Sequence, residues 1–468
     1  MTPTAATHDR ALPTLEERFS GDVIRPSDPR YSAARTLWNA MIDNRPALIA
    51  RPRTPEDVAS AILGARDAGL EIAIRCGGHS VSGHSMADGG LTIDLSGMNA
   101  VSVDPGARIA RVGGGALLND VAEAAMVRHA LTIPFGHVSH TGVGGLTLGG
   151  GIGWVMRRYG LAIDSLRSAE VITAEGEIVR ASDEENADLF WALRGGGGNF
   201  GIVTEFEFDL HPFGPEVLAG LILHRLDDAP EVLRFSRDFM ETAPDELTVF
   251  ETFMTAPPEE PFPVEVQGRP CLGLGLVYAG PVSEGEEVLR PLRTFGRPAL
   301  DGVAPMPALA VQQMLDPTAP HGMQNYNKAH WMNGLPNEAI DEQVRLHAEV
   351  PSPMSLIVNA RMGGAVERVA PEATAFGHRD ANRQVWVVSS WWDGDRDEHV
   401  QWCRRVFEAM TRHSSGGVYV NALGDEGSER VRASYAGEIW TRLVAVKDRW
   451  DPDNVFHLNQ NIPPSARA

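Results

Sequence analysis

The residues best suited to chemistry lie between Ile74 and His84, in the stretch I-R-C-G-G-H-S-V-S-G-H. Gly77 and Gly78 allow a sharp turn and a close approach of ligand to backbone, because neither carries a Cβ atom. Successive backbone N–H groups in such a turn form a cradle that suits an anion such as phosphate. His79 projects from this loop. A tight turn with an incidental histidine is the alternative interpretation, because glycine-rich loops are common.

A second glycine-rich stretch, at 138–154, reads V-S-H-T-G-V-G-G-L-T-L-G-G-G-I-G-W. Glycine loses more conformational entropy on folding than any other residue, so this density is costly unless something must approach the backbone closely. We interpret it as a surface for a large planar or phosphorylated ligand.

A third such stretch, R-G-G-G-G-N-F-G at 194–201, places Gly196, Gly198 and Gly201 in G-x-G-x-x-G spacing. A dinucleotide fingerprint of this kind requires a strand before it and a helix after it. Here a short helix precedes the glycines, and residues 202–210 alternate as a strand does. We therefore reject a Rossmann-type NAD site.

A strand–helix–strand unit is expected to position the first loop. Apolar runs at 47–50 and 71–75 predict strands, and a helix should begin at Pro55, with Thr54 as its N-cap, and end at Gly69. Further elements follow in the same region: strands at 91–95, 100–103, 169–173 and 178–181, and a helix at 117–127.

The pattern changes near residue 213, where the glycine clusters stop. Strand-like runs at 217–224, 247–255, 271–278, 354–362 and 384–392 alternate with helical stretches, which predicts a mixed sheet with helices on one side. Residues 417–421 read as one more strand and 428–450 as mostly helical. The predicted fold class is α+β, with three segments: 1–213, a substrate domain at 214–414, and 415–468 returning to the first domain.

Composition limits the classes of function. The chain has 468 residues, 43% of them hydrophobic, and a net charge of −21, which opposes binding to nucleic acid or to an anionic membrane. No run of about 18 apolar residues predicts a membrane span, and residues 1–19 lack the apolar core of a signal peptide. Three widely spaced cysteines suggest neither disulfides nor a metal site, so we expect a cytoplasmic protein without a metal.

The sequence at 75–83, Arg-x-Gly-Gly-His-Ser-x-x-Gly, resembles the flavin-attachment loop of the vanillyl-alcohol-oxidase superfamily, and most of all its berberine-bridge-enzyme-like branch. The other glycine-rich stretches and the tail Asn459-Gln460-Asn461 follow in the family's order, so the resemblance covers nearly the whole chain. Taken alone, the tail would read as a polar turn. The resemblance implies a PCMH-type FAD-binding domain, split between the two ends of the chain, and an α+β substrate domain whose mixed or antiparallel sheet is covered by helices.

The resemblance also implies FAD bonded covalently through its 8α-methyl group to His79. The residues that it implies around the cofactor are Arg75, Cys76, Gly77, Gly78, His79, Ser80, Gly83, His84, Val138, Thr141, Gly142, Gly144, Gly145, Gly149, Gly151, Gly153, Trp154, Gly201, Ile202, Val203, Asn421, Asn459 and Asn461.

Two departures from the family pattern bear on catalysis. Many members carry a second flavin link from a cysteine at the position of Val138, and many have a catalytic tyrosine at the position of Ala422. Tyr419 is the best remaining candidate for a catalytic residue. In a strand, however, Tyr419 and Asn421 would share one face and Ala422 would point to the other, so Tyr419 could not simply replace a base at 422. Candidate substrate contacts are Tyr326, His330 and Trp392, although each could serve packing alone.

The favoured function is an oxidase of a small metabolite in secondary metabolism, with a polyketide-like, alcohol or amine substrate and molecular oxygen as electron acceptor. A carbohydrate or oligosaccharide oxidase, a flavin dehydrogenase with another acceptor and a non-catalytic flavin-binding protein remain alternatives. The sequence does not define the oligomeric state.

Overall fold

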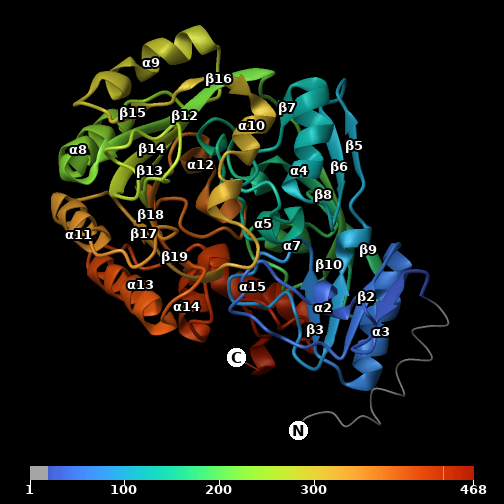
Figure 1. Ribbon diagram of the computed structural model, residues 1–468. Helices are drawn as coiled ribbons and strands as arrows, with labels where there is room; N and C mark the ends of the chain where they lie inside the picture. Colours follow the sequence, from blue (N-terminus) through green and yellow to red (C-terminus); the bar gives the residue numbers. More distant parts are fainter. Residues whose placement is uncertain (1–18, 436, 468) are drawn as a thin grey trace.

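The computed structural model describes residues 19–435 and 437–467, and it forms three main β-sheets with helices around them (Figure 1). The expectation for the N-terminal residues 1–18 lies outside the described part. Among the described residues, no helix is both long and apolar enough to cross a lipid bilayer.

The first sheet has the order β1-β2-β4-β3, with β2, β4 and β3 parallel to one another. Its strands are β1 (Asp22–Ile24), β2 (Leu48–Arg51), β3 (Ile72–Arg75) and β4 (Leu91–Asp94). Helix α3 (Pro55–Ala68) joins β2 to β3, as a parallel crossover requires. The Thr54 side chain accepts a hydrogen bond from Asp57 N (3.3 Å), and Gly69 ends the helix with φ 64°. The predicted strand–helix–strand unit is therefore present.

The second sheet is antiparallel, with the order β5-β6-β10-β8-β9. Its strands are β5 (Val101–Asp104), β6 (Ile109–Gly113), β8 (Leu166–Ile172), β9 (Ile178–Ser182) and β10 (Ile202–Asp209). A short pair, β7 (Leu131–Thr132) with β11 (His211–Pro212), lies beside it. The helices of this region are α2 (Tyr31–Ala34), α4 (Leu118–Val121), α5 (Val143–Leu148), α6 (Met156–Tyr159) and α7 (Ala187–Leu193). The predicted helix at 117–127 continues beyond α4 as a π-helical turn, Ala122–Val127.

The third sheet has the order β15-β12-β14-β13-β18-β19-β17, with β16 pairing to β12. Every pair of its described strands is antiparallel, which is one of the two sheet types, mixed or antiparallel, that the sequence predicted. Its strands are β12 (Glu216–Arg225), β13 (Leu247–Thr255), β14 (Pro270–Tyr278), β15 (Leu300–Asp301), β16 (Ala304–Pro307), β17 (Gln324–Met332), β18 (Leu356–Arg361) and β19 (Arg383–Trp391).

The two faces of this third sheet belong to different cores. Its outer face is covered by α8 (Ala229–Met240), α9 (Val282–Thr294), α11 (Asn337–His347) and α13 (Arg396–Thr411) (Figure 1). Val385 and Val387 of β19 pack into that outer core, whereas Ala329 and Trp331 of β17 join the core of the glycine-rich region. Alternation along each strand thus separates a helix-covered face from a face toward the glycine-rich loops.

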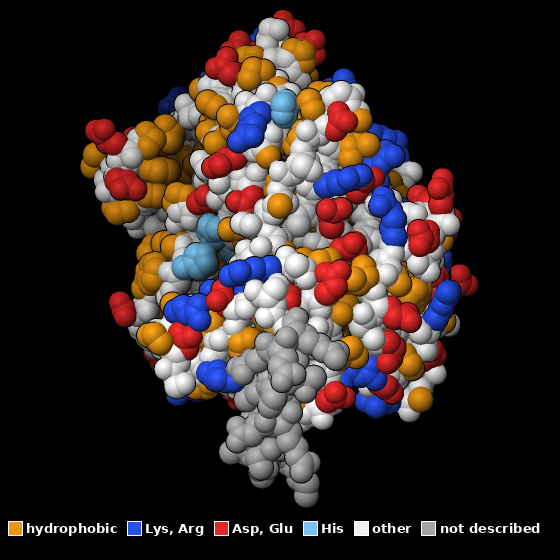
Figure 2. All heavy atoms as spheres, turned by 90° about the vertical axis from the view of Figure 1, so that its right-hand side faces the viewer, with side chains coloured by type: hydrophobic (Ala, Val, Ile, Leu, Met, Phe, Trp, Pro, Cys, Tyr) orange, Lys and Arg blue, Asp and Glu red, His pale blue; other side chains and the backbone are white. Residues whose placement is uncertain are grey.

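The C-terminal segment passes the third sheet at α14 (Ser428–Ala433), where Arg430 donates to Ala329 O of β17 (3.1 Å), and returns to the glycine-rich region through α15 (Gly437–Trp450), which packs against α7 (Figure 1). The strand predicted at 417–421 is wrong: these residues form no ladder, and Val420–Ala422 is a 3₁₀ turn. Two further short helices, α10 (Ala308–Gln313) and α12 (Ala365–Arg368), lie between the third sheet and the glycine-rich region. Over the face shown in Figure 2, basic and acidic side chains are interspersed, without a continuous basic area.

Candidate functional site

His79 lies in the loop that follows β3, and its ring is held in place by Trp38. The two rings stack with centroids 4.9 Å apart and 15° between their planes. Trp38 is itself fixed, because its backbone N donates to Gly78 O (3.2 Å) and its Nε1 donates to Ala319 O (2.8 Å). The loop therefore presents His79 in one defined orientation.

Two more histidines complete a cluster at this point. His79 Nε2 lies 2.7 Å from Nδ1 of His140, which belongs to the second glycine-rich stretch, and the side chain of His321 lies beside both. Burial, together with the two neighbouring histidines, holds the pKa of His79 well below its usual range. His79 is therefore neutral at physiological pH, as a nucleophilic imidazole nitrogen must be.

The first two glycine-rich stretches pack directly against each other. A Cβ atom on Gly77 would lie 2.3 Å from Gly142 N, and one on Gly153 would lie 1.5 Å from Phe135 O. By contrast, a Cβ on Gly145 would meet no atom within 4 Å. Most of these glycines thus permit contact between protein segments, and only a few face open space where a ligand could lie. From the sequence, we had interpreted the second stretch as a surface for a large planar or phosphorylated ligand.

Cys76 lies where these two glycine-rich stretches contact each other. Its thiol donates to Ala116 O (3.4 Å), and burial raises its pKa to about 11. A protonated thiol is a poor nucleophile. Because Val138 offers no sulfur and Cys76 stays protonated, neither position favours a second covalent bond to a flavin.

The other predicted residues of the His79 loop contact one another or the adjacent strand. Arg75 donates to Ala34 O and lies 4.0 Å from the Asp94 carboxylate. Ser80 Oγ accepts from His84 N (3.2 Å), which closes the loop on itself. In Gly83, a Cβ atom would lie 2.8 Å from the Ile42 side chain, so this glycine too serves packing.

Most of the remaining residues predicted to bind the cofactor in this region contact other parts of the protein. Thr141 N donates to Val138 O (3.1 Å), and Trp154 packs edge-on against Phe250 of β13 (4.9 Å). A Cβ on Gly144 would lie 3.1 Å from Gly114 O. Gly201 precedes β10, where Ile202 and Val203 are buried. The order of helix α7, glycine loop and strand β10 is the one that the sequence predicted.

Tyr419 lies beneath the second glycine-rich stretch and is 4% exposed. Its hydroxyl oxygen accepts hydrogen bonds from Gly151 N (3.1 Å) and from Asn421 Nδ2 (2.9 Å), and burial raises the pKa of the phenol. Asn421 also donates to Leu146 O (3.1 Å) in α5. These contacts show that Tyr419 holds the loop, and its role as the catalytic residue stays a prediction. The two side chains meet across the 3₁₀ turn, without the strand alternation that the sequence suggested.

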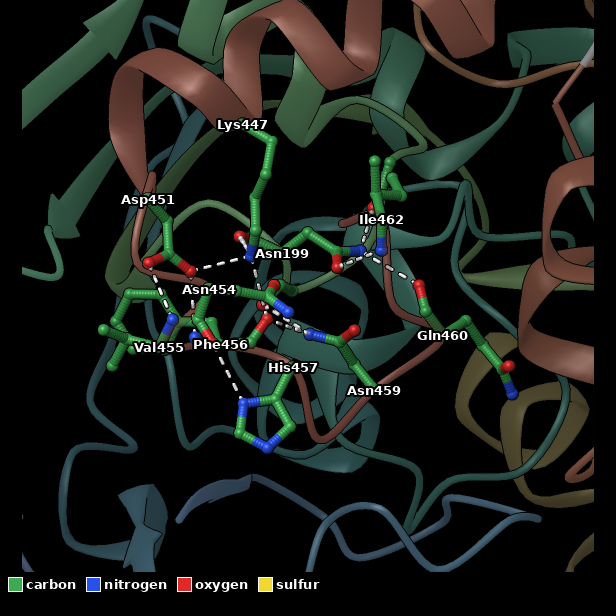
Figure 3. Close-up of polar contacts among 12 residues, drawn as sticks. Asn199, Lys447, Asp451, Asn454, Val455, Phe456, His457, Asn459, Gln460 and Ile462 are labelled. Carbon is green, nitrogen blue, oxygen red and sulfur yellow. Dashed lines mark hydrogen bonds and ion pairs between the residues drawn. The ribbon is translucent and has the colours of Figure 1, made fainter. Parts of the chain in front are cut away.

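The Asn-Gln-Asn tail packs on the third glycine-rich stretch, as Figure 3 shows. Asn459 Nδ2 donates to Gly198 O (3.0 Å), and Asn199 Oδ1 accepts from Ile462 N (2.9 Å). Lys447 Nζ donates to Asn199 O (2.8 Å) and to Asp451 Oδ2 (2.7 Å). The buried Lys447–Asp451 pair, which sequence reasoning missed, joins the tail to the loop.

The structure places Tyr326 and His330, the predicted substrate contacts, against helix α13 and away from the glycine-rich loops. Arg404 of α13 donates to Tyr326 Oη (3.3 Å), and the His330 ring stacks on Phe407 of the same helix (4.1 Å). Both side chains therefore lie on the helix-covered face of β17. The alternate residue Asn327 lies on the opposite face, together with Ala329 and Trp331.

Across from these residues, β19 contributes Gln384 and Trp386, which pair with Trp331 and Ala329 respectively. Cross-strand partners share a face. Gln384 and Trp386 thus face the glycine-rich region, and sequence reasoning missed them. Trp392 follows on the same face, 51% exposed, with its ring beside Gly322 in the loop that carries His321.

Several buried polar atoms around these loops have no hydrogen-bond partner within the described residues. They come from α5, β17, β19 and the tail: Thr147 Oγ1, Asn327 Oδ1, Gln384 Nε2, Trp386 Nε1, Asn459 Oδ1 and Asn461 Oδ1. Buried polar atoms are normally paired, so unpaired ones on the elements around these loops fit a missing polar ligand. Together with the open space at Gly145 and the neutral His79, these donors and acceptors fit a large cofactor such as FAD.

Comparison with known proteins points in the same direction. Residues 46–182 match the model of an FAD binding domain, and residues 418–463 match the "Berberine and berberine like" model. The chain is 30% identical to an FAD-linked oxidoreductase of Dictyostelium discoideum, with 96% of each chain covered. It is also 30% identical to (R)-6-hydroxynicotine oxidase of Paenarthrobacter nicotinovorans, covering 96% of this chain and 98% of the relative.

A solved structure shows the same overall fold. Glucooligosaccharide oxidase from Acremonium strictum, described as carrying a 6-S-cysteinyl, 8α-N1-histidyl FAD, superposes with a TM-score of 0.86. The sequences are 25% identical, and the match covers 97% of this chain and 99% of the other.

Proposed function

Because this chain belongs to the berberine-bridge-like family of FAD-linked oxidoreductases, we propose that it oxidises a small organic metabolite with FAD bonded covalently to His79 and with oxygen as the electron acceptor. One observation carries the proposal. His79 is a neutral, rigidly held imidazole where two glycine-rich loops meet, and within the described residues no hydrogen bond engages its Nδ1.

The chain's own residues divide the work of holding the cofactor and the substrate. His79 would fix the flavin, and the N–H groups and open surface near Gly145 would support it. The unpaired Asn459 and Asn461 oxygens would bind polar groups of the cofactor. Bound FAD would supply the redox chemistry, by accepting a hydride from the substrate and passing its electrons to oxygen.

The face of the third sheet that carries Asn327, Gln384 and Trp386 would bind the substrate. Two of these residues offer buried polar atoms without partners, and the indole of Trp386 offers an N–H beside a flat apolar surface. Trp392, exposed at the edge of this face, is proposed as a contact for the substrate as it enters. This arrangement suits an aromatic or polyketide-like molecule with a few polar groups.

The absence of a catalytic base at Ala422 further limits the class of substrates that we propose. Ala422 is fully buried and takes no proton, and the Tyr419 hydroxyl already accepts two hydrogen bonds. General-base help is worth roughly 10²–10⁴ in rate, so its loss is least costly for a substrate that ionises readily. An acidic or already enolised substrate, or a neutral amine, is therefore favoured over a plain alcohol.

A carbohydrate oxidase is the second candidate, because glucooligosaccharide oxidase shares the fold. Val138 and Ala422 argue against it, since the 6-S-cysteinyl link that names that enzyme has no sulfur here to form it. We propose a cytoplasmic enzyme of secondary metabolism. The presence of all three cysteines as free thiols is consistent with this location.

A substrate panel tests this proposal. Purified enzyme is mixed anaerobically with polyketide-like phenols, enolised dicarbonyls, amines, alcohols and oligosaccharides, and flavin bleaching is followed; hydrogen peroxide is then measured in air. Bleaching by the acidic or amine compounds with stoichiometric peroxide supports the proposal. Bleaching by oligosaccharides alone would establish the second candidate, and bleaching without peroxide would indicate a dehydrogenase. No bleaching by any compound would favour a non-catalytic flavin-binding protein.

A further inference from the structure

The contact between His79 and His140 joins two loops that are 61 residues apart in the sequence. His140 is held as firmly as His79, because the adjacent Ser139 donates from its N (2.8 Å) and its Oγ (2.6 Å) to the carboxylate of Asp316. Thr141, on the other side, donates to Val138 O. The 2.7 Å separation between the two ring nitrogens is thus built into the fold.

Only one proton can lie between these nitrogens, so one ring donates and the other accepts. If His79 carries the proton on Nε2, its Nδ1 lone pair is free for bond formation. If that proton moves to His140, the electron density at Nδ1 of His79 increases, and so does its nucleophilicity.

The surrounding charges favour transfer in this direction. Three influences lower the pKa of His79: its burial, His140 and His321. All three disfavour a positive charge on the His79 ring. Burial and His321 also lower the pKa of His140, but the Asp316 carboxylate raises it by favouring the charged ring. Arg75 is the other charged group near the cluster, and its effect falls on His321. A proton shared by the pair is therefore more stable on His140.

We propose that His140 is a positioning residue for flavin attachment: it orients His79 through Nε2 and accepts its proton, so that Nδ1 forms the covalent bond. This inference rests on the proposed covalent link to His79. In the balanced step, the 8α-methyl carbon loses one proton to solvent and forms a bond to Nδ1, and His79 gives its Nε2 proton to His140. The flavin gains two electrons; oxygen then takes these two electrons together with the two released protons and leaves as hydrogen peroxide.

The test follows the attachment step itself. Full-length protein is produced in riboflavin-starved cells and mixed with FAD in air, with a chelator present so that no metal bridges the three histidines. At each time, total bound FAD is measured by gel filtration, and covalent FAD is measured as flavin that survives acid precipitation. The variants are His140→Gln, which keeps a polar side chain but accepts no proton, and His140→Ala. His321→Gln is the matched control from the same cluster.

We expect both His140 variants to bind FAD but to attach it at least tenfold more slowly than the wild type, and added imidazole to restore the rate of His140→Ala. His321→Gln should stay within about twofold of the wild type. Attachment by His140→Gln at the wild-type rate, or no effect of imidazole on His140→Ala, would overturn the inference. Loss of all FAD binding in both variants would also count against it, because His140 would then act in binding. If the wild-type protein never forms a covalent bond to FAD, the proposed link to His79 is refuted. That result differs from a failure of the proposed role of His140.

Discussion

The hydroxyl oxygen of Tyr419 lies 3.1 Å from the backbone nitrogen of Gly151 and accepts its hydrogen bond. The contact joins the C-terminal segment to the second glycine-rich stretch, across 268 residues of sequence. Asn421 extends it by donating to the same hydroxyl and to Leu146 O. Tyr419 and Asn421 therefore tie the C-terminal segment to the second glycine-rich stretch.

Tyr419→Phe should lower stability more than catalysis. The change leaves the buried N–H of Gly151 and one N–H of Asn421 without an acceptor, at a cost of about 1–3 kcal/mol. Chemical denaturation measures this loss, and anaerobic stopped flow should show flavin reduction slowed less than tenfold. A hundredfold loss of reduction rate at unchanged flavin content would show that Tyr419 is the base after all.

Gly145, inside helix α5, and Gly149, which ends that helix, form a matched pair. A Cβ on Gly149 would lie 2.2 Å from Asn421 Oδ1, whereas one on Gly145 meets open space. Gly149→Ala should therefore destabilise the protein by about 1–3 kcal/mol. Gly145→Ala, within helix α5, should leave stability unchanged or raise it by up to about 1 kcal/mol.

The same pair tests the route of oxygen. If oxygen reaches the flavin past Gly145, then Gly145→Val should slow reoxidation of the reduced enzyme several-fold at an unchanged melting temperature. Mixing the anaerobically reduced enzyme with oxygenated buffer gives this rate. Equal reoxidation rates in the wild type and Gly145→Val would place the oxygen route elsewhere.

Cys76→Ala should leave covalent flavin content unchanged. Cys76 is partly buried, and a pKa raised by burial to about 11 keeps its thiol protonated at neutral pH. The folded wild type should also resist thiol-labelling reagents at this position, whereas denatured protein should react. A flavin-bearing peptide containing Cys76, identified by mass spectrometry, would contradict this expectation.

His330 predicts a dependence of stability on pH. Burial lowers its pKa from 6.5 to about 4, so between these values the unfolded chain binds a proton that the folded chain does not. The free energy of unfolding is therefore not reduced by His330 above about pH 6.5. As the pH falls toward 4, protonation of this residue in the unfolded chain lowers that free energy by at most about 3 kcal/mol.

His330→Phe, which can keep the stack on Phe407, should flatten the fall in unfolding free energy between pH 6.5 and 4. Denaturant titrations at several pH values measure the slope. KM should not change, because the side chain lies on the helix-covered face of β17. An unaltered slope, or a large rise in KM, would contradict its assignment to the core.

The sequence predicts much of this fold because its signals are local. Thr54 and Gly69 bound α3, and alternation at 202–210 identifies β10, so both were found. The sequence did not show which side chains of β17 face the glycine-rich loops. The first half of this strand, Asn325 to Lys328, has no alternation of apolar and polar residues that would identify its buried face. The His79–His140 and Lys447–Asn199 contacts join distant segments, and no local pattern encodes such contacts.

The most direct measurement is the mass of the peptide that contains His79. Wild-type protein, precipitated with acid and digested with trypsin, should give a yellow peptide spanning His79 whose mass is increased by that of FAD. No other peptide should carry the cofactor, and His79→Ala should lose all flavin on denaturation. An unmodified His79 peptide from a flavin-loaded enzyme, or flavin retained by denatured His79→Ala, would contradict the account.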